Sequence, residues 1–217
     1  LYPEKVSTDG SQPFDEAHDV LRREHPSCVH GLVYALDYAN DVIKLFGTKG
    51  NKPDMEGIAS SYTGSYLCKS GSREPHYKSI LGYNNTEVLK KLANYAIENS
   101  ADWDLANMVS CLDSYNKQKV LPSGLTSGWY LPSIEEMRML INETETINAS
   151  MAKANGLSLW YLNGTEGAND PRGRFNGYWS SSLRAGYLFY MVKDGKEGDS
   201  INGYVWNLGY FRFSFAF

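Results

Sequence analysis

The 217-residue chain is short of cysteine, of charged residues and of long apolar runs, and each shortage excludes a class of protein. Its three cysteines, Cys28, Cys68 and Cys111, are widely spaced and form no Cys-x-x-Cys pair, which indicates neither a zinc site nor a disulfide framework. One bridge with one free thiol, and three buried thiols, are both compatible with this spacing. No apolar run is long enough to cross a membrane as a helix.

Charge is scarce and slightly negative. Charged residues make up 21% of the chain and its formal net charge is -4, so we expect no nucleic-acid partner. In contrast, the chain holds 16 tyrosines and 20 glycines. Tyrosine presents a flat amphipathic ring at a low entropic cost, so this composition favours irregular loops and a contact surface, although some tyrosines will pack in a β core.

Catalytic motifs are absent as well. The chain has no Gly-x-Ser-x-Gly and no His-Glu-x-x-His, and its histidines all lie in the N-terminal half. Glu135 and Glu136 are adjacent, but a helix cap explains Glu136, so we expect no enzyme activity and no cofactor. Asn169, Asp170 and Asp199 could ligate a hard cation, yet such residues in loops are typical of turns, so no metal site is expected.

Apolar spacing and capping residues predict helices in the first two thirds of the chain. The clearest start is a capping box formed by Ser133 and Glu136 directly after Pro132. Gly47–Pro75 is rich in Gly, Ser, Lys and Pro and should be mostly loop. The predicted helices cover residues 14–23 with Asp15 as cap, residues 87–99 with Thr86 as cap, the segment that follows Asp104, and residues 134–141.

Strand patterns appear at both ends of the chain. Gly31–Leu36 is a short apolar run that predicts a buried strand, and Tyr187–Val192 predicts another, followed by a turn at Lys193–Gly195. Over Phe211–Phe217 the phenylalanines occupy one face of a strand, with Arg212, Ser214 and Ala216 on the other. This last strand needs a partner, and pairing with Gly31–Leu36 would bring the two ends of the domain together.

Three motifs carry a resemblance to a known family. They are Gly128-Trp-Tyr-Leu-Pro-Ser133, Tyr178-Trp-Ser-Ser-Ser182 and the closing Ala216-Phe217. Together they resemble bacterial lectin-like surface proteins with the C-type lectin architecture of the formylglycine-generating-enzyme type. The resemblance implies an α+β fold, with two or three helices on a small twisted antiparallel sheet. It covers residues 28–217 as a ligand-binding domain and leaves residues 1–27 as a polar, partly helical extension.

The motif residues themselves are expected to be structural. Trp129, Leu131 and Trp179 are predicted core anchors, and the hydroxyls of Ser180–Ser182 are expected to bond to nearby backbone. The family's closing Arg-Pro-Val-Arg is replaced by Arg212-Phe-Ser-Phe, so the last strand is expected to pack differently. The enzymes of this fold use two C-terminal cysteines with copper, and this chain has no cysteine after Cys111.

In the family that the chain resembles, ligands bind on the last sheet and its loops. Some members are variable proteins of diversity-generating retroelements, which rewrite that stretch of the gene; here it would run over residues 183–210. We therefore expect a binding face of mixed aromatic, aliphatic and polar side chains on this stretch. The predicted ligand-binding residues are Leu183, Arg184, Tyr187, Phe189, Tyr204, Trp206, Asn207, Leu208 and Tyr210.

The resulting hypothesis is a non-catalytic ligand-binding protein displayed on a bacterial surface, with a role in adhesion or as a receptor. Its partner would be a protein or a glycan on another cell or host surface. We expect it to be extracellular and anchored by a lipid on a cysteine upstream of Leu1, in a segment since removed. Two alternatives are a receptor-binding protein of a phage tail and a vestigial enzyme of the formylglycine-generating-enzyme fold.

Overall fold

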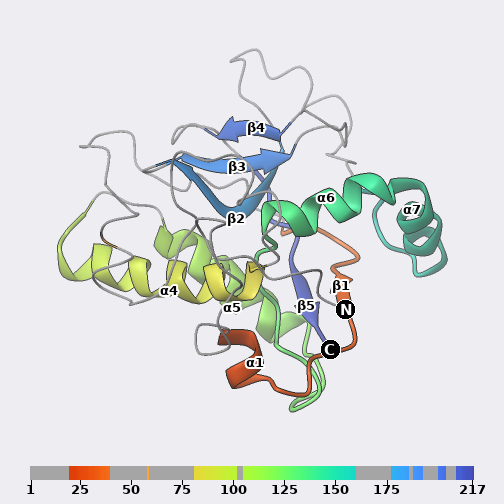
Figure 1. Ribbon diagram of the computed structural model, residues 1–217, viewed down its shortest axis with the longest axis horizontal. Coiled ribbons are helices and arrows are strands. Elements are labelled where there is room, and N and C mark those ends of the chain that lie inside the picture. Colours follow the sequence, from red (N-terminus) through yellow and green to blue (C-terminus); the bar gives the residue numbers. More distant parts are fainter. Residues whose placement is uncertain are drawn as a thin grey trace, which may run out of the picture.

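We describe residues 20–39, 58, 81–101, 105–159, 177–185, 188–192, 200–203 and 209–217 of the computed structural model, with only the backbone of residues 183–185, 188, 190 and 200–203. Helices and a three-stranded sheet form two layers, with α4 and α5 beneath the sheet and α6 beside it (Figure 1). The helices are α1 (Val20–Glu24), α4 (Gly82–Glu98), α5 (Leu105–Gln118), α6 (Ile134–Asn142) and α7 (Thr144–Lys153). The strands are β1 (Leu32–Tyr34), β2 (Tyr178–Ala185), β3 (Leu188–Val192), β4 (Ser200–Gly203) and β5 (Ser214–Ala216).

The strands form two antiparallel sheets. Strands β2, β3 and β4 pair in chain order, and Leu183 lies opposite Phe189 in the first of these pairs. Strand β1 pairs with β5, so that Val33 lies opposite Phe215. The predicted pairing of the first and last strands is thereby confirmed. Tyr130 extends this small sheet, because its N–H donates to the Ser214 carbonyl at 2.8 Å and its carbonyl accepts from Ser214 N–H at 2.9 Å.

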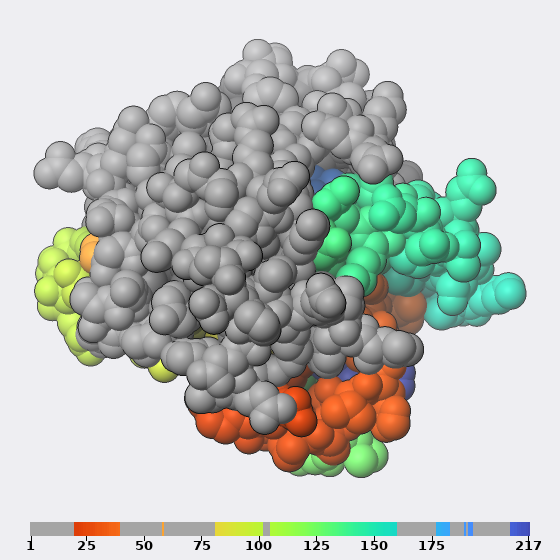
Figure 2. Space-filling view, in the orientation of Figure 1, coloured from red at the N-terminus to blue at the C-terminus, as the bar shows by residue number. Residues whose placement is uncertain are grey.

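Two predicted helices are confirmed close to their expected ends. Helix α5 follows Asp104 and buries Leu105, Met108 and Leu112 on one face. Helix α6 begins with the predicted capping box, in which the Ser133 hydroxyl accepts from Glu136 N–H and the Glu136 carboxylate accepts from Ser133 N–H. Helix α7 follows α6 and projects from the body of the molecule (Figure 2).

The predicted start of the helix over residues 87–99 is wrong. Helix α4 begins at Gly82, and Thr86 lies inside it rather than capping it. The Thr86 hydroxyl donates to the Gly82 carbonyl at 2.8 Å and accepts from the Leu131 N–H at 3.0 Å. Thr86 therefore links α4 to the motif Gly128–Ser133, called the Gly-Trp motif below. This tertiary role could not be predicted from the local sequence pattern.

The described part of the N-terminal segment lies against the domain. Helix α1 contributes Val20 and Leu21 to a buried cluster that also contains Tyr83 of α4, Tyr130 and Ala216. The predicted cap Asp15 and the first residues of that helix lie outside the described residues, as does the predicted turn at Lys193–Gly195. The predicted loop over Gly47–Pro75 also lies outside them, apart from Ile58.

The segment Phe211–Ala216, which ends in β5, is largely buried on both faces. Phe211 and Phe213 stack on each other inside the main core, while Arg212, Ser214 and Ala216 on the opposite face are also inaccessible. The main core further contains the predicted anchors Trp129, Leu131 and Trp179, which are confirmed as buried. The α+β class is thus confirmed, and the C-type-lectin-like type stays a prediction.

Candidate ligand-binding site

The two longest motifs contact each other where β2 meets the start of α6. The Ser182 hydroxyl accepts from the Ile134 N–H at 3.0 Å, and the Ser181 N–H donates to the Pro132 carbonyl at 2.8 Å. The Ser180 hydroxyl accepts from the Ser182 N–H at 3.3 Å. These bonds fix β2 to the start of α6. The predicted bonding of hydroxyls to backbone is confirmed for Ser180 and Ser182, whereas the Ser181 hydroxyl accepts from the Asn85 side chain.

The structure describes only part of the predicted binding face. Leu183 and Arg184 belong to β2, and Phe189 belongs to β3. The two strands form an antiparallel pair in which Leu183 lies opposite Phe189. Tyr210 follows the sheet in the chain and pairs with Tyr178. The remaining predicted binding residues, which lie outside the described residues, are Tyr187, Tyr204, Trp206, Asn207 and Leu208.

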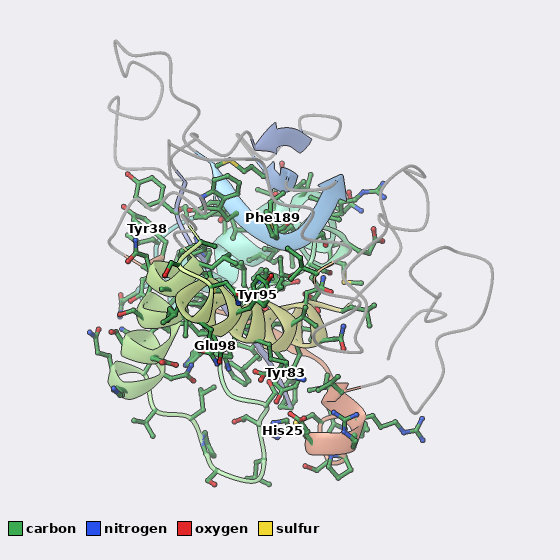
Figure 3. The ribbon with its side chains drawn as sticks, turned by 90° about the vertical axis from the view of Figure 1, so that its left-hand side faces the viewer. His25, Tyr38, Tyr83, Tyr95, Glu98 and Phe189 are labelled. Atoms are coloured by element: carbon green, nitrogen blue, oxygen red, sulfur yellow. The ribbon has the colours of Figure 1, made fainter. Side chains whose placement is uncertain are left out.

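Phe189 is a correction to the predicted face. Its side chain is 1% exposed and belongs to the main core together with Met191, which lies on the same face of β3. In Figure 3 Phe189 lies between the three-stranded sheet and the helices. Because alternate residues of a strand point to opposite faces, Phe189 holds the sheet onto the helical layer and is not available to a ligand.

Tyr210 is half-buried and also has a structural role. Its ring meets the Tyr38 ring edge-on at a centroid distance of 4.9 Å, and its carbonyl accepts from the Trp179 N–H at 3.0 Å. Its N–H donates to the Gly177 carbonyl at 2.9 Å. Tyr210 therefore joins β2 to the loop after β1, and only part of its surface remains for contact with a ligand.

Glu136 is fully engaged inside the protein. It is 1% exposed, its carboxylate accepts from the Ser133 N–H at 2.6 Å, and the Tyr130 hydroxyl donates to it at 3.3 Å. Burial raises the pKa of Glu136 to about 7, although its hydrogen bonds act in the opposite direction. Its neighbour Glu135 pairs with Arg138 at 3.3 Å. The two carboxylates are thus held apart in separate structural roles.

Arg212 stands at the first arginine position of the resembled family's closing motif and is buried. Its guanidinium donates to the carbonyls of Ala35, Leu36, Leu157 and Ser158 at 2.7–3.3 Å. These carbonyls come from the segment after β1 and from the segment after α7. Arg212 therefore ties the last strand to two distant parts of the chain.

The cysteines and metal-ligating residues add no further site in the described part of the chain. Cys28 and Cys111 form no disulfide with each other, and burial raises the pKa of Cys28. Among the described residues there is no group of three His, Cys, Asp or Glu side chains that could hold a metal ion. Cys68, Asn169, Asp170 and Asp199 lie outside those residues. No helix within the described ranges is long and apolar enough to span a membrane.

A groove between α4 and α5 was not predicted from the sequence. It encloses about 400 Å³ and is lined mainly by polar side chains, among them Asp113 and Lys117. The two lie one helical turn apart on α5, which was visible in the sequence. An exposed charged pair at this spacing is the ordinary pattern of a surface helix, so it did not single out a site.

Comparison with known proteins points to fimbriae. No family model matches the chain. The whole chain is 26% identical, over 226 residues, to a Bacteroides ovatus protein named "Putative fimbrium tip subunit Fim1C", and it spans 38% of that protein's length. Its fold is similar to the crystal structure of a fimbrial protein from Bacteroides ovatus, with a TM-score of 0.68 at 24% identity. That match covers 99% of this chain and 42% of the other.

Proposed function

We propose that this chain is a non-catalytic, ligand-binding domain of a bacterial fimbrial protein, displayed outside the cell and used in adhesion. The observation that carries the proposal is the similarity of the whole chain to part of a protein named as a fimbrium tip subunit. A tip subunit occupies the end of the appendage that meets other surfaces first. A domain at that position is well placed to bind a protein or a glycan on another cell.

The architecture supports a binding role. The motif segments and Arg212 are buried, and the first and last strands pair with each other, so together they form a hydrogen-bonded base for the three-stranded sheet. Binding residues are most effective when a rigid scaffold positions them. The segments that join and follow the strands of this sheet are therefore the proposed contact surface, with Tyr204, Trp206 and Asn207 among its proposed binding residues.

We further propose that the frame is of the C-type lectin type. Two features support this: the first and last strands pair with each other, and the two motif segments meet at the start of α6. In that architecture the stretch over residues 183–210 carries the ligand face. Variation of this stretch by a retroelement would change the ligand while the buried base stays constant.

The proposal can be tested with the purified chain carrying a fluorescent label. We expect saturable binding to cultured epithelial cells or to beads coated with a cell-surface extract, measured by flow cytometry and competed by unlabelled protein. Tyr204→Ala and Asn207→Ala should each reduce binding about tenfold or more, because central contact residues carry most of an interface's energy. Their melting temperatures should stay close to that of the unchanged protein.

Leu125→Ala is the matched control. Leu125 is 66% exposed, and its carbonyl accepts from the Cys28 thiol in the segment that follows α1. This variant should bind normally. Equal binding by all three variants would show that the contact surface lies elsewhere on the molecule. Absence of competed binding to either surface would contradict the adhesion role itself.

A further inference from the structure

The groove between α4 and α5 has two polar walls built at helical spacing. Tyr83, Glu87 and Lys90 follow one another along one face of α4, and Asp113, Asn116 and Lys117 do so on α5. Residues three and four apart on a helix share a face, so both rows point into the same space. Its volume of about 400 Å³ is within the range of small-molecule sites, about 300–1,000 Å³.

The floor of the groove is the start of the Gly-Trp motif, and it is rigid. The Asn116 side chain accepts from the Trp129 N–H at 3.1 Å and donates to the Leu112 carbonyl at 3.1 Å. The indole N–H of Trp129 donates to the Lys119 carbonyl at 2.7 Å. Gly128 has a φ of +75°, a conformation that side chains disfavour. The floor is thus already in one conformation before any ligand arrives, which lowers the entropic cost of binding.

Two aromatic rings border this polar space. Trp129 is 9% exposed and is held edge-on by Tyr115 and Phe215, so only one part of its ring reaches the groove. The hydroxyl of Tyr83 donates to Glu24 at 2.8 Å, and burial together with this bond raises the pKa of Tyr83. Figure 3 shows Tyr83, the second residue of α4, close to His25. Tyr83 therefore offers ring surface to the groove and not its hydroxyl.

The charges in the groove cancel. Lys90 pairs with Glu87 at 2.6 Å, so each neutralises the other. Asp113 and Lys117 are exposed, and within the described part of the chain neither makes a hydrogen bond or an ion pair. They leave a strong acceptor and a strong donor one helical turn apart, ready for an incoming group.

This composition selects one class of ligand. An anion such as phosphate would gain from the lysines but would be repelled by both carboxylates. An apolar molecule would bury charged groups without compensation. A neutral sugar carries no charge that the carboxylates would repel, and its hydroxyls can donate to and accept from the charged groups. Its C–H face can lie on an aromatic ring. We propose that this groove binds a short neutral carbohydrate, separately from the proposed contact surface on the sheet.

The test is a titration followed by ¹⁵N-NMR of the purified chain with maltose, cellobiose, lactose and N-acetyllactosamine as probes. At least one disaccharide should shift the Ser127, Gly128 and Trp129 amides and the Trp129 indole N–H in a saturable way. Asp113→Asn combined with Lys117→Met should weaken that binding about tenfold or more, because each removes one charge-assisted hydrogen bond. Lys91→Met with Glu145→Gln, exposed charges outside the groove, should leave it unchanged.

The outcomes separate the alternatives. No shift at these signals with any of the four sugars would overturn the proposal. Equal or larger shifts with inorganic phosphate or with the zwitterion glycylglycine would also overturn it, because they would show recognition of charge. The inference does not rest on the adhesion role. Tyr204→Ala should leave the sugar titration intact, and the Asp113 and Lys117 variant should leave binding by the sheet surface intact.

Discussion

Glu136 is a carboxylate without access to solvent whose hydrogen-bond donors come from two helix starts. It accepts from the Ser133 N–H at the start of α6 and from the Gly82 N–H at the start of α4. A Cβ at position 82 would collide with this carboxylate, so only glycine permits the close approach. At the scale of single residues, the contact between the starts of α4 and α6 thus depends on the Glu136 carboxylate and on the absence of a side chain at Gly82.

The raised pKa of Glu136 predicts a pH-dependent stability. The protein binds this proton more tightly when folded, so the free energy of unfolding should fall as pH rises from about 4.5 to about 7. The expected contribution is roughly 3 kcal/mol, since each pKa unit corresponds to about 1.4 kcal/mol. Glu136→Gln cannot titrate and should show a flatter profile in urea unfolding over this range.

Glu135→Gln is the control for that measurement. Glu135 is partly exposed and paired with Arg138 on the same helix, so its replacement should leave the pH profile nearly parallel to that of the unchanged protein. If Glu136→Gln and Glu135→Gln gave parallel profiles, the buried carboxylate would not be the titrating group. The difference between the two profiles isolates Glu136 from the other acidic residues.

At the scale of helices and strands, local signals predicted some boundaries and missed others for identifiable reasons. The start of α6 was predictable because both partners of its capping box lie within four residues of sequence. The start of α4 was not, because Gly82-Tyr-Asn-Asn reads as a turn and its stabilising partners, Leu131 and Glu136, lie about fifty residues later. Tertiary contacts therefore override the weak local preference.

The binding face shows the same limit. The run Leu188–Val192 is apolar throughout, so its pattern predicts a strand but not which side faces the core. Phe189 and Met191 turn inward, which removes one expected contact residue. The buried motif residues Trp129 and Trp179 were predicted correctly, because core positions follow from hydrophobicity and motif context alone. The groove between α4 and α5 arises from three segments that meet only in the folded chain.

Thr86 provides a test at this scale. Thr86→Val preserves the shape of the side chain but leaves the buried Leu131 N–H without its acceptor. We expect a loss of about 1–3 kcal/mol in the free energy of unfolding, measured by urea denaturation. Thr146→Val, at an exposed position of α7, is the matched control and should change stability by less than about 0.5 kcal/mol. Similar losses in both variants would show that Thr86 acts only through helix propensity.

At the scale of the whole molecule, Arg212 joins three regions that are distant in sequence. Arg212 is 1% exposed, and its guanidinium donates to carbonyls at positions 35–36 and 157–158. A side chain of this kind acts as a multi-point hydrogen-bond donor inside the domain. These hydrogen bonds also explain why the segment that leads into β5 tolerates a charged residue at a buried position.

Removing this donor should destabilise the entire domain. Arg212→Met removes the four hydrogen bonds to these carbonyls, one of them fully buried, and we expect a cost of about 3–5 kcal/mol in unfolding free energy. Arg138→Met, which removes an exposed arginine and its surface ion pair on α6, should cost no more than about 1 kcal/mol. Thermal unfolding followed by circular dichroism measures both. Comparable melting temperatures for the two variants would show that the buried bonds contribute little net stability.

The pairing of β1 with β5 also governs when the chain can fold. Phe211 and Phe213 fill the centre of the main core, and Leu32–Tyr34 has no ladder partner among the described strands other than Ser214–Ala216. A chain leaving a ribosome or a secretion channel therefore lacks its nucleus of long-range contacts until these residues emerge. Contacts across such a sequence distance form slowly, so we expect this domain to stay unfolded, and thus able to pass through narrow pores, until residues 211–217 have emerged.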